Sequence, residues 1–216
     1  MAKSLQQINL EFNRESGFER GLAALPRFSD ILRAAFSEFR YRGKAELEMG
    51  GVVWRVLATE DEAVLLISKE ILGRRKFHGA SPFCGWNESE IRAYLNGAFY
   101  DRFPAEARAL IPAVANDTAT DCEGERVSRD RIFLLSLDEA RDGRYFADAE
   151  DRIALYGGEG PWWWWLRCCG AGIDANAAVN DTVAAVDKNG IFNRAYTDLE
   201  MGGVRPALWM RLGGGA

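Results

Sequence analysis

The sequence predicts an α+β fold, because strand-like segments lie at both ends of the chain and helix-like segments lie near its middle. We expect a strand pair within residues 52–72, two helices within 87–114, and a hairpin followed by a last strand within 183–212. A long irregular insert precedes that last strand. Since no repeat or linker divides residues 50–212, we expect them to form one domain.

Residues 1–48 are predicted to be a helical extension. Apolar side chains recur there at spacings of three and four, which is typical of an apolar stripe on a helix. Ser29 is the expected N-cap, with Pro26 just before it. The stripe favours either an accessory helix packed on the domain or a contact between copies of the chain. Its members are Leu22, Leu25, Phe28, Ile31, Leu32, Ala35, Phe36 and Phe39.

Two apolar segments, VVWRVLA and AVLLISKEIL, flank the acidic turn TEDE and predict a β-hairpin. In the first segment apolar residues stand on both alternating faces, so we expect a strand that is nearly buried on both sides. Its two faces are Val52, Trp54 and Val56, and Val53, Arg55 and Leu57.

The middle of the chain predicts two helices and a further helix start. Asn87 or Ser89 is the expected cap of the first helix, whose buried face carries Ile91, Leu95 and Phe99. Pro104 is expected in the first turn of the second helix, PAEARALIPAV. Residues 116–130 are polar and turn-rich. The segment DRIFLLSLDEA then predicts a short strand and a helix start, with Ser136 and Glu139 at the spacing of a capping box.

The last 60 residues differ in composition from the rest. Residues 157–216 contain 11 of the 22 Gly and five of the seven Trp. Asn189-Gly190 predicts a hairpin turn within VAAVDKNGIFNRAY. GVRPALWMRL predicts a terminal strand, in which Pro206 interrupts the hydrogen bonding at one position.

The composition excludes several classes of protein. A net charge of −5 argues against a nucleic-acid-binding protein, and no apolar run approaches the roughly 20 residues of a membrane span. The start lacks the apolar region of a signal peptide, so we expect synthesis in the cytoplasm. With His78 as the single histidine, a His-based zinc site or a Ser–His–Asp triad is hard to build.

Six segments stand in an order that resembles a known family: VVWRVL, LLISKEIL, WNESEIRAYLNGAFYDRF, RIFLLSLDEA, WWLR and GVRPALWM. They resemble bacterial and phage domains of the C-type lectin fold, on the branch of the formylglycine-generating enzyme. That group includes variable proteins of diversity-generating retroelements, which act as receptor-like binding proteins. The resemblance covers residues 50–212. It implies a C-type-lectin-like ligand-binding domain at 49–216, with a variable region at about 162–205.

In the diversified branch, mutation targets adenines in codons of the form AAY, and these codons can never become Trp, Met, Lys, Gln or Glu. The frame residues Trp164, Trp165 and Trp209 are therefore expected to be fixed. Arg167 and Arg205 are expected to complete this frame as hydrogen-bond donors. The residues of the region that can be reached from AAY, and are expected on the variable surface, are Cys168, Cys169, Ala171, Ile173, Asp174, Asn176, Phe192, Arg194, Tyr196, Asp198 and Leu199.

The run of four Trp residues has two interpretations. On a strand, successive side chains point to opposite faces, so about half of them should be buried. We expect Trp162 and Trp163 as ligand contacts, because rigid aromatic side chains give contact area at low entropic cost. The alternative is that all four are core residues.

The cysteines also allow a second function. If the chain were an oxidase similar to the formylglycine-generating enzyme, Cys168 and Cys169 would be its redox-active cysteines. The local sequence motif of that enzyme is missing around them. We therefore expect both to be exposed or half-exposed on a binding surface. The four cysteines lack zinc-ribbon spacing, and the acidic residues 121–125 lack the spacing of a calcium loop. No cofactor is expected, with calcium and copper left open.

The expected partner is a protein or another macromolecule that binds the variable surface without covalent chemistry. The chain is then a phage-associated or cell-surface protein, and it is open whether copies of it associate. A surface module of the same fold without sequence variation is the third interpretation.

Overall fold

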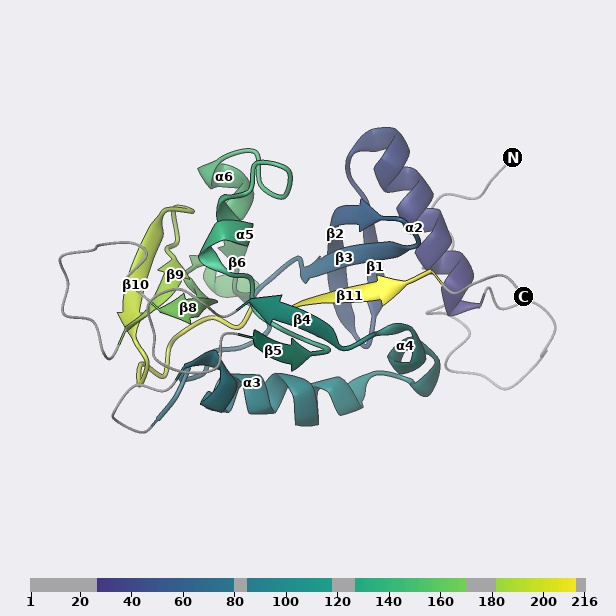
Figure 1. Cartoon of the computed structure of the whole chain (residues 1–216). Coiled ribbons are helices and arrows are strands. Elements are labelled where there is room, and N and C mark those ends of the chain that lie inside the picture. Colours follow the sequence, from purple (N-terminus) through teal and green to yellow (C-terminus); the bar gives the residue numbers. More distant parts are fainter. Residues whose placement is uncertain (1–26, 80–84, 118–126, 170–181, 213–216) are drawn as a thin grey trace.

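The computed structural model describes residues 27–79, 85–117, 127–169 and 182–212. Figure 1 shows two ends: a four-stranded sheet with helix α2 across it, and a three-stranded sheet beside two short helices. Helices and small antiparallel sheets are thus mixed along the chain, which confirms the α+β class. Within the described residues, no helix is long and apolar enough to cross a membrane.

The four-stranded antiparallel sheet has the order β1-β2-β3-β11. Its strands are β1 (Glu46–Met49), β2 (Val52–Glu60), β3 (Ala63–Ser68) and β11 (Ala207–Arg211). The predicted hairpin β2–β3 and the predicted last strand are both confirmed. Between β1 and β2, Gly50 and Gly51 have φ values of 62° and 72°, which a two-residue hairpin turn requires.

Helix α2 (Phe28–Arg42) packs on β1 and β2, and Phe28, Ile31, Leu32 and Ala35 of the apolar stripe are buried. Leu22 and Leu25 of the stripe lie outside the described residues. The expected cap was wrong, since the N-cap is Arg27 and Ser29 lies inside the helix. The expectation of helix through residue 48 was also wrong. Gly43, with φ 70°, ends the helix by donating its N–H to the carbonyl of Phe39, and the chain then pairs with β2. Of the two interpretations of the stripe, the packed accessory helix fits this burial.

Strand β2 is less buried than expected. Val52, Trp54 and Val56 face the core, but Val53 is 42% exposed. Leu57 is buried next to Val56 because the pairing with β3 shifts register between residues 56 and 58. The prediction that both faces are buried was therefore wrong for the first half of the strand.

The middle of the chain forms one helical run followed by a short helix and a small hairpin. Ser89 caps α3 by accepting a hydrogen bond from the backbone N–H of Arg92, as predicted. The run continues through a wide turn at Gly97, and the predicted face Ile91, Leu95 and Phe99 is buried. The run consists of η1 (Trp86–Glu88), α3 (Glu90–Tyr94), η2 (Leu95–Phe99) and η3 (Tyr100–Arg102), and it is followed by α4 (Ala105–Leu110), β4 (Val114–Asp117) and β5 (Val127–Asp130).

Two expectations for this region were wrong. Pro104 is the N-cap of α4 and lies just before its first turn. The segment expected to be turns contains the paired strands β4 and β5 on either side of residues 118–126, which lie outside the described residues. By contrast, the capping box of Ser136 and Glu139 at the start of α5 is confirmed.

The second end of the molecule carries the three-stranded antiparallel sheet β10-β9-β8. Asp187 stabilises the hairpin turn between β9 and β10, because its carboxylate accepts the backbone N–H groups of Asn189 and Ile191. The predicted hairpin at Asn189-Gly190 is confirmed. The elements of this end are α5 (Leu137–Arg141), α6 (Ala149–Arg152), β6 (Ala154–Leu155), η4 (Gly157–Glu159), β7 (Pro161–Trp162), β8 (Trp164–Cys169), β9 (Thr182–Val186) and β10 (Phe192–Tyr196).

One extended segment, residues 202–205, joins the two ends. On one side it exchanges backbone hydrogen bonds with residues 72–75, and on the other with residues 163–165. A Cβ at Gly202 would overlap the indole of Trp165, so only glycine allows this close approach. The start and the end of the β8–β10 region are therefore held next to each other.

Candidate ligand-binding surface

Trp164 and Trp165 are fully buried at the base of the three-stranded sheet. The Trp164 indole donates to the carbonyl of Arg152, and the Trp165 indole donates to that of Arg75. Two of the four Trp side chains are thus fully buried, as expected for frame residues, but they are neighbours in the sequence, so burial does not alternate along the run. Both faces of β8 are covered, since Trp164 packs on Phe146 and Trp165 packs edge-on against Phe77.

Two buried arginines surround these tryptophans. Arg205 is 2% exposed and donates hydrogen bonds to the carbonyls of Ser68 and Arg152, and burial lowers its pKa to about 9. Its guanidinium stacks on Trp164, with 4.9 Å to the ring centroid. Arg167 is 4% exposed and pairs with the Glu139 carboxylate, at 2.5 Å between Nη1 and Oε2. Both side chains are part of the core.

Trp209, the last frame residue, lies on β11 at the other end. It is half-buried against the core and lines a separate groove beside the acidic turn 60–62.

Cys168 lies in the core, contrary to expectation. We expected an exposed or half-exposed thiol, but Cys168 is 6% exposed, and its Sγ accepts the backbone N–H of Leu137 at 3.2 Å. Burial raises its pKa to about 11, which is opposite to the shift that activates a nucleophilic thiol. The thiol is buried because the start of α5 covers β8. The side chain of Cys169 lies outside the described residues.

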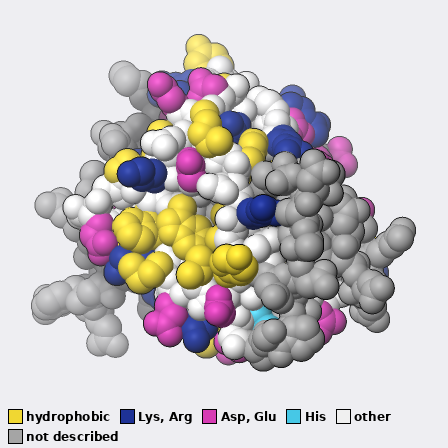
Figure 2. Space-filling model, turned by 90° about the vertical axis from the view of Figure 1, so that its left-hand side faces the viewer, with side chains coloured by type: hydrophobic (Ala, Val, Ile, Leu, Met, Phe, Trp, Pro, Cys, Tyr) yellow, Lys and Arg dark blue, Asp and Glu magenta, His cyan; other side chains and the backbone are white. Residues whose placement is uncertain are grey.

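A groove of about 660 Å³ lies on the side of the hairpin turned toward Trp163. Its floor is apolar, and charged or amide side chains form its rim. Figure 2 looks onto this end of the molecule and shows hydrophobic side chains gathered together, with acidic and basic side chains around them. The groove is lined by Glu159, Pro161, Trp162, Trp163, Ala185, Asp187, Lys188, Asn189, Asn193, Arg194, Ala195 and Leu199.

Trp162 and Trp163 are half-buried and line this groove. The Trp162 indole donates to the carbonyl of Met201 at 2.8 Å, and its ring lies 5.2 Å from the guanidinium carbon of Arg74. Trp163 packs edge-on against Trp165, with 4.7 Å between the ring centroids. Both rings are thus fixed by neighbours while part of their surface stays open.

The predicted residues of β10 all stand on the strand face that is turned away from the groove. Because side chains alternate along a strand, Phe192, Arg194 and Tyr196 share one face, and Asn193 and Ala195 share the other. The groove lies on the side of Asn193 and Ala195, and Arg194 reaches its rim. Sequence reasoning missed the groove residues 159, 161, 185, 187–189, 193 and 195. The turn Asn189-Gly190 was the available signal, because it fixes which strand residues pair.

The other predicted surface residues differ in exposure. Tyr196 is 62% exposed, Leu199 is 42% exposed, and Asp198 is also exposed. Phe192 instead packs against the core, with the Arg152 guanidinium 4.5 Å from its ring centroid. Ala171, Ile173, Asp174 and Asn176 lie outside the described residues.

Metal-binding groups are not found in the part of the chain that the structure describes, where no three His, Cys, Asp or Glu side chains are placed to hold an ion. Cys84, Cys122 and the acidic residues 121–125 lie outside that part.

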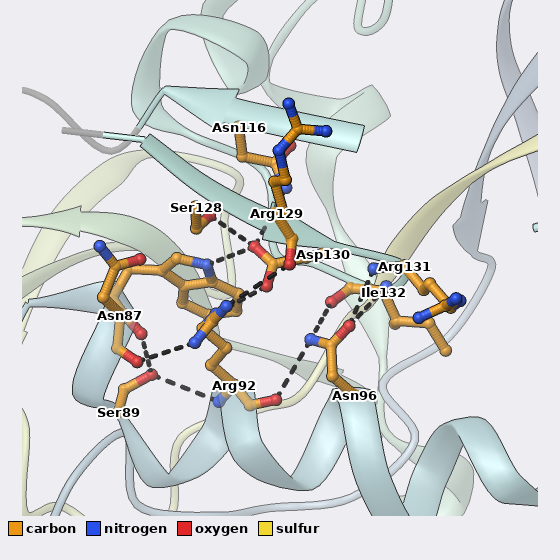
Figure 3. Close-up of polar contacts among 11 residues, drawn as sticks. Asn87, Ser89, Arg92, Asn96, Asn116, Ser128, Arg129, Asp130, Arg131 and Ile132 are labelled. Atoms are coloured by element: carbon orange, nitrogen blue, oxygen red, sulfur yellow. Dashed lines mark hydrogen bonds and ion pairs between the residues drawn. The ribbon is translucent and has the colours of Figure 1, made fainter. Parts of the chain in front are cut away.

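Asp130 forms a polar cluster that the sequence did not indicate (Figure 3). Its side chain is fully buried and accepts hydrogen bonds from Trp86, Asn116 and Ser128, and it pairs with Arg92 at 2.6 Å. These donors come from η1, α3, β4 and β5, so the carboxylate ties the helical run to the small hairpin. Because the Asp130 carboxylate finds all of these hydrogen-bond partners within the protein, we assign the cluster a structural role.

The comparisons with known proteins give one result. A family model described as "Domain of unknown function (DUF6273)" matches residues 61–212. No curated protein and no solved structure matches the chain. The matched residues include β3, the helical run, the groove and β11.

Proposed function

The chain belongs to this family of domains of unknown function, and from that premise we propose that it is a binding protein whose hairpin groove recognises another protein. The observation that carries the proposal is the placement of Trp162 and Trp163. They lie half-open in a groove whose base, Trp164 and Trp165, is fully buried. Large aromatic side chains held rigidly at a surface are typical of the residues that dominate protein interfaces.

The charge around the groove supports a protein ligand. Glu159 and Asp187 lie on its rim with Lys188 and Arg194, so both signs are present. An apolar centre with a mixed polar rim is the usual composition of a protein-binding site.

The proposal has a second, more specific part, namely that the fold is C-type-lectin-like and that a retroelement diversifies the gene. Support comes from the part of the variable set that lies at the surface, whereas its members Cys168 and Phe192 lie in the core or pack against it. Arg194, Asp198 and Leu199 are reachable from AAY codons and lie at the groove or on exposed surface, whereas the frame tryptophans Trp164 and Trp165 are buried. The test is a search beside the gene for a near-copy of the segment encoding residues 162–205, next to a reverse transcriptase. The copies should differ only at adenines. Without such a copy, the chain is a surface module with a constant groove.

The binding proposal is tested by photo-crosslinking. A photoreactive phenylalanine replaces Leu199 at the groove, and in a control protein it replaces Tyr41, which is 88% exposed on α2. We expect a protein from an extract of the producing cells to crosslink from position 199 and not from position 41. Unlabelled wild-type chain should compete for it, and the Asn193→Arg variant should compete at least tenfold less well. Equal crosslinking from both positions, or equal competition by the variant, would exclude the groove as the binding site.

A further inference from the structure

A second pocket of about 370 Å³ lies beside the groove. Three consecutive basic residues, Arg74, Arg75 and Lys76, line it together with Glu90, Ile91 and Glu200. The backbone of this basic run is fixed, because the Arg75 N–H donates to the carbonyl of Gly202 and the Arg75 carbonyl accepts the Trp165 indole. The basic side chains therefore start from a rigid position.

The three cations are used differently. Arg74 pairs with Glu159 at 3.1 Å and stacks on Tyr156 and Trp162. Lys76 pairs with Glu200 at 3.5 Å. Arg75 lies flat on the ring of Tyr94, with its guanidinium carbon 3.7 Å from the ring centroid. Among the described residues, no acceptor takes a hydrogen bond from this guanidinium.

Stacking on Tyr94 leaves the edge of the Arg75 guanidinium available. Its N–H groups lie in the plane of the group, so a ring against one face does not block them. They form a planar fork that matches the two oxygens of a carboxylate. The stack also holds the side chain in place, which lowers the entropy that a ligand must overcome.

The charge of the pocket selects the kind of anion. Of the three basic side chains in the described lining, Arg74 and Lys76 are each paired with a glutamate, which leaves the single charge of Arg75 for a ligand. A singly charged carboxylate neutralises this charge. A phosphate dianion would leave an uncompensated negative charge beside Glu90 and Glu200.

The pocket and the groove are neighbours. Arg74, in the wall of the pocket, touches Trp162 and Glu159 in the wall of the groove, and Glu200 follows Leu199. We propose that Arg75 binds a single carboxylate, and, resting on the proposed function, that this carboxylate belongs to an acidic segment of the protein ligand. An apolar side chain of the same segment then occupies the groove.

The test uses N-acetylphenylalanine, which carries one carboxylate and one ring, in NMR titrations of the full chain at pH 7. The Nε–Hε signal of Arg75 reports the pocket, and the indole signals of Trp162 and Trp163 report the groove. We expect the Arg75 signal to shift to saturation, and Arg75→Gln to weaken binding about tenfold, as for loss of a charged hydrogen bond. The matched control is Arg40→Gln, an exposed arginine that stacks on Phe36 of α2, and it should leave binding unchanged.

Comparison with the uncharged amide of the same probe measures how much the carboxylate contributes to binding. The amide should bind the wild type about tenfold more weakly, and Arg75→Gln should weaken amide binding no further. If Arg75→Gln leaves the affinity for N-acetylphenylalanine unchanged, the assignment is wrong. If inorganic phosphate binds more tightly than the probe and depends on Arg75, the carboxylate is the wrong anion. If the probe shifts the indole signals of Trp162 and Trp163 but not the Arg75 signal, the groove still binds the ligand. In that case only the assignment of the carboxylate to Arg75 is wrong.

Discussion

Replacing Arg167 by methionine should cost about 3 kcal/mol of folding free energy. Arg167 pairs with Glu139 and donates hydrogen bonds to the carbonyls of Leu134 and Asp117, at 2.8 and 3.2 Å. Methionine fills part of the space but removes the Arg167 donors from both carbonyls and from the Glu139 carboxylate, which keeps only the backbone N–H of Ser136. Removing one partner of a buried ion pair costs about 3–5 kcal/mol, and the lower end applies because the Glu139 side chain is 31% exposed and can regain water.

The matched control is Arg144→Met. Arg144 pairs with Asp142 at 2.6 Å, almost the same distance as in the Arg167–Glu139 pair, but its side chain is 77% exposed. Urea unfolding followed by tryptophan fluorescence measures both variants. We expect a lower midpoint for Arg167→Met and an unchanged midpoint for Arg144→Met.

Two further variants test the Arg167–Glu139 pair. Glu139→Gln keeps the hydrogen-bond acceptor and should cost about 1 kcal/mol, and this variant remains measurable if Arg167→Met fails to fold. In the double variant, Glu139→Gln should add little to the cost of Arg167→Met, because the pair is already broken. A loss below about 1 kcal/mol for Arg167→Met, or fully additive costs, would show that the pair contributes no more than an exposed one.

Experiments at three other positions, Cys168, Gly202 and Asp151, have equally specific expected outcomes. In a variant that keeps Cys168 as its only cysteine, iodoacetamide at pH 8 should react about 100-fold more slowly than with a free thiol, because the pKa is raised from 9.0 to about 11; denaturant should restore the rate. Gly202→Ala should lower the free energy of unfolding by about 2 kcal/mol, since the new methyl group meets the Trp165 indole; an unchanged denaturation midpoint would show that the contact is loose. Asp151→Asn should cost about 1 kcal/mol at pH 7. The bidentate Arg55 guanidinium lowers the pKa of Asp151 below its ordinary value of 3.8. The difference in stability between wild type and Asp151→Asn should therefore persist above pH 3.8 and vanish as the pH falls below it. A stability difference that does not depend on pH would contradict the ion pair.

The features predicted correctly depend on residues close together in the sequence. The Asn189-Gly190 turn requires only its own backbone geometry, and the box of Ser136 and Glu139 requires one helical turn. Strand β1 was missed because its partner β2 decides its conformation. The segment ELEM has no strong preference of its own, and the glycine that ends α2 does not indicate whether a strand or a loop comes next.

For the candidate site, the sequence indicated the region but misplaced several side chains. Trp162 and Trp163 were expected at the surface and line the groove. Cys168 was expected at the surface because a cysteine codon can arise by mutation of an AAY codon. Whether a codon can mutate does not determine whether its side chain is buried in the fold. The position of Cys168 is decided by α5, which comes from a distant part of the chain and covers β8. The Asp130 cluster escaped notice for the same reason, since its donors come from four elements.

Trp163 and Trp165 exchange backbone hydrogen bonds with Gly203, and these bonds close the chain between them into a loop. Residues 72–75, which lie outside this loop, hold the Gly203 end in place. The entropy of closing such a loop rises only slowly with length, by about 0.6 kcal/mol for each doubling. For protein engineering, this closure separates the two ends of the domain. Lengthening the chain between residues 165 and 203 should leave the four-stranded sheet to fold as before, because β1, β2, β3 and β11 all lie outside that stretch.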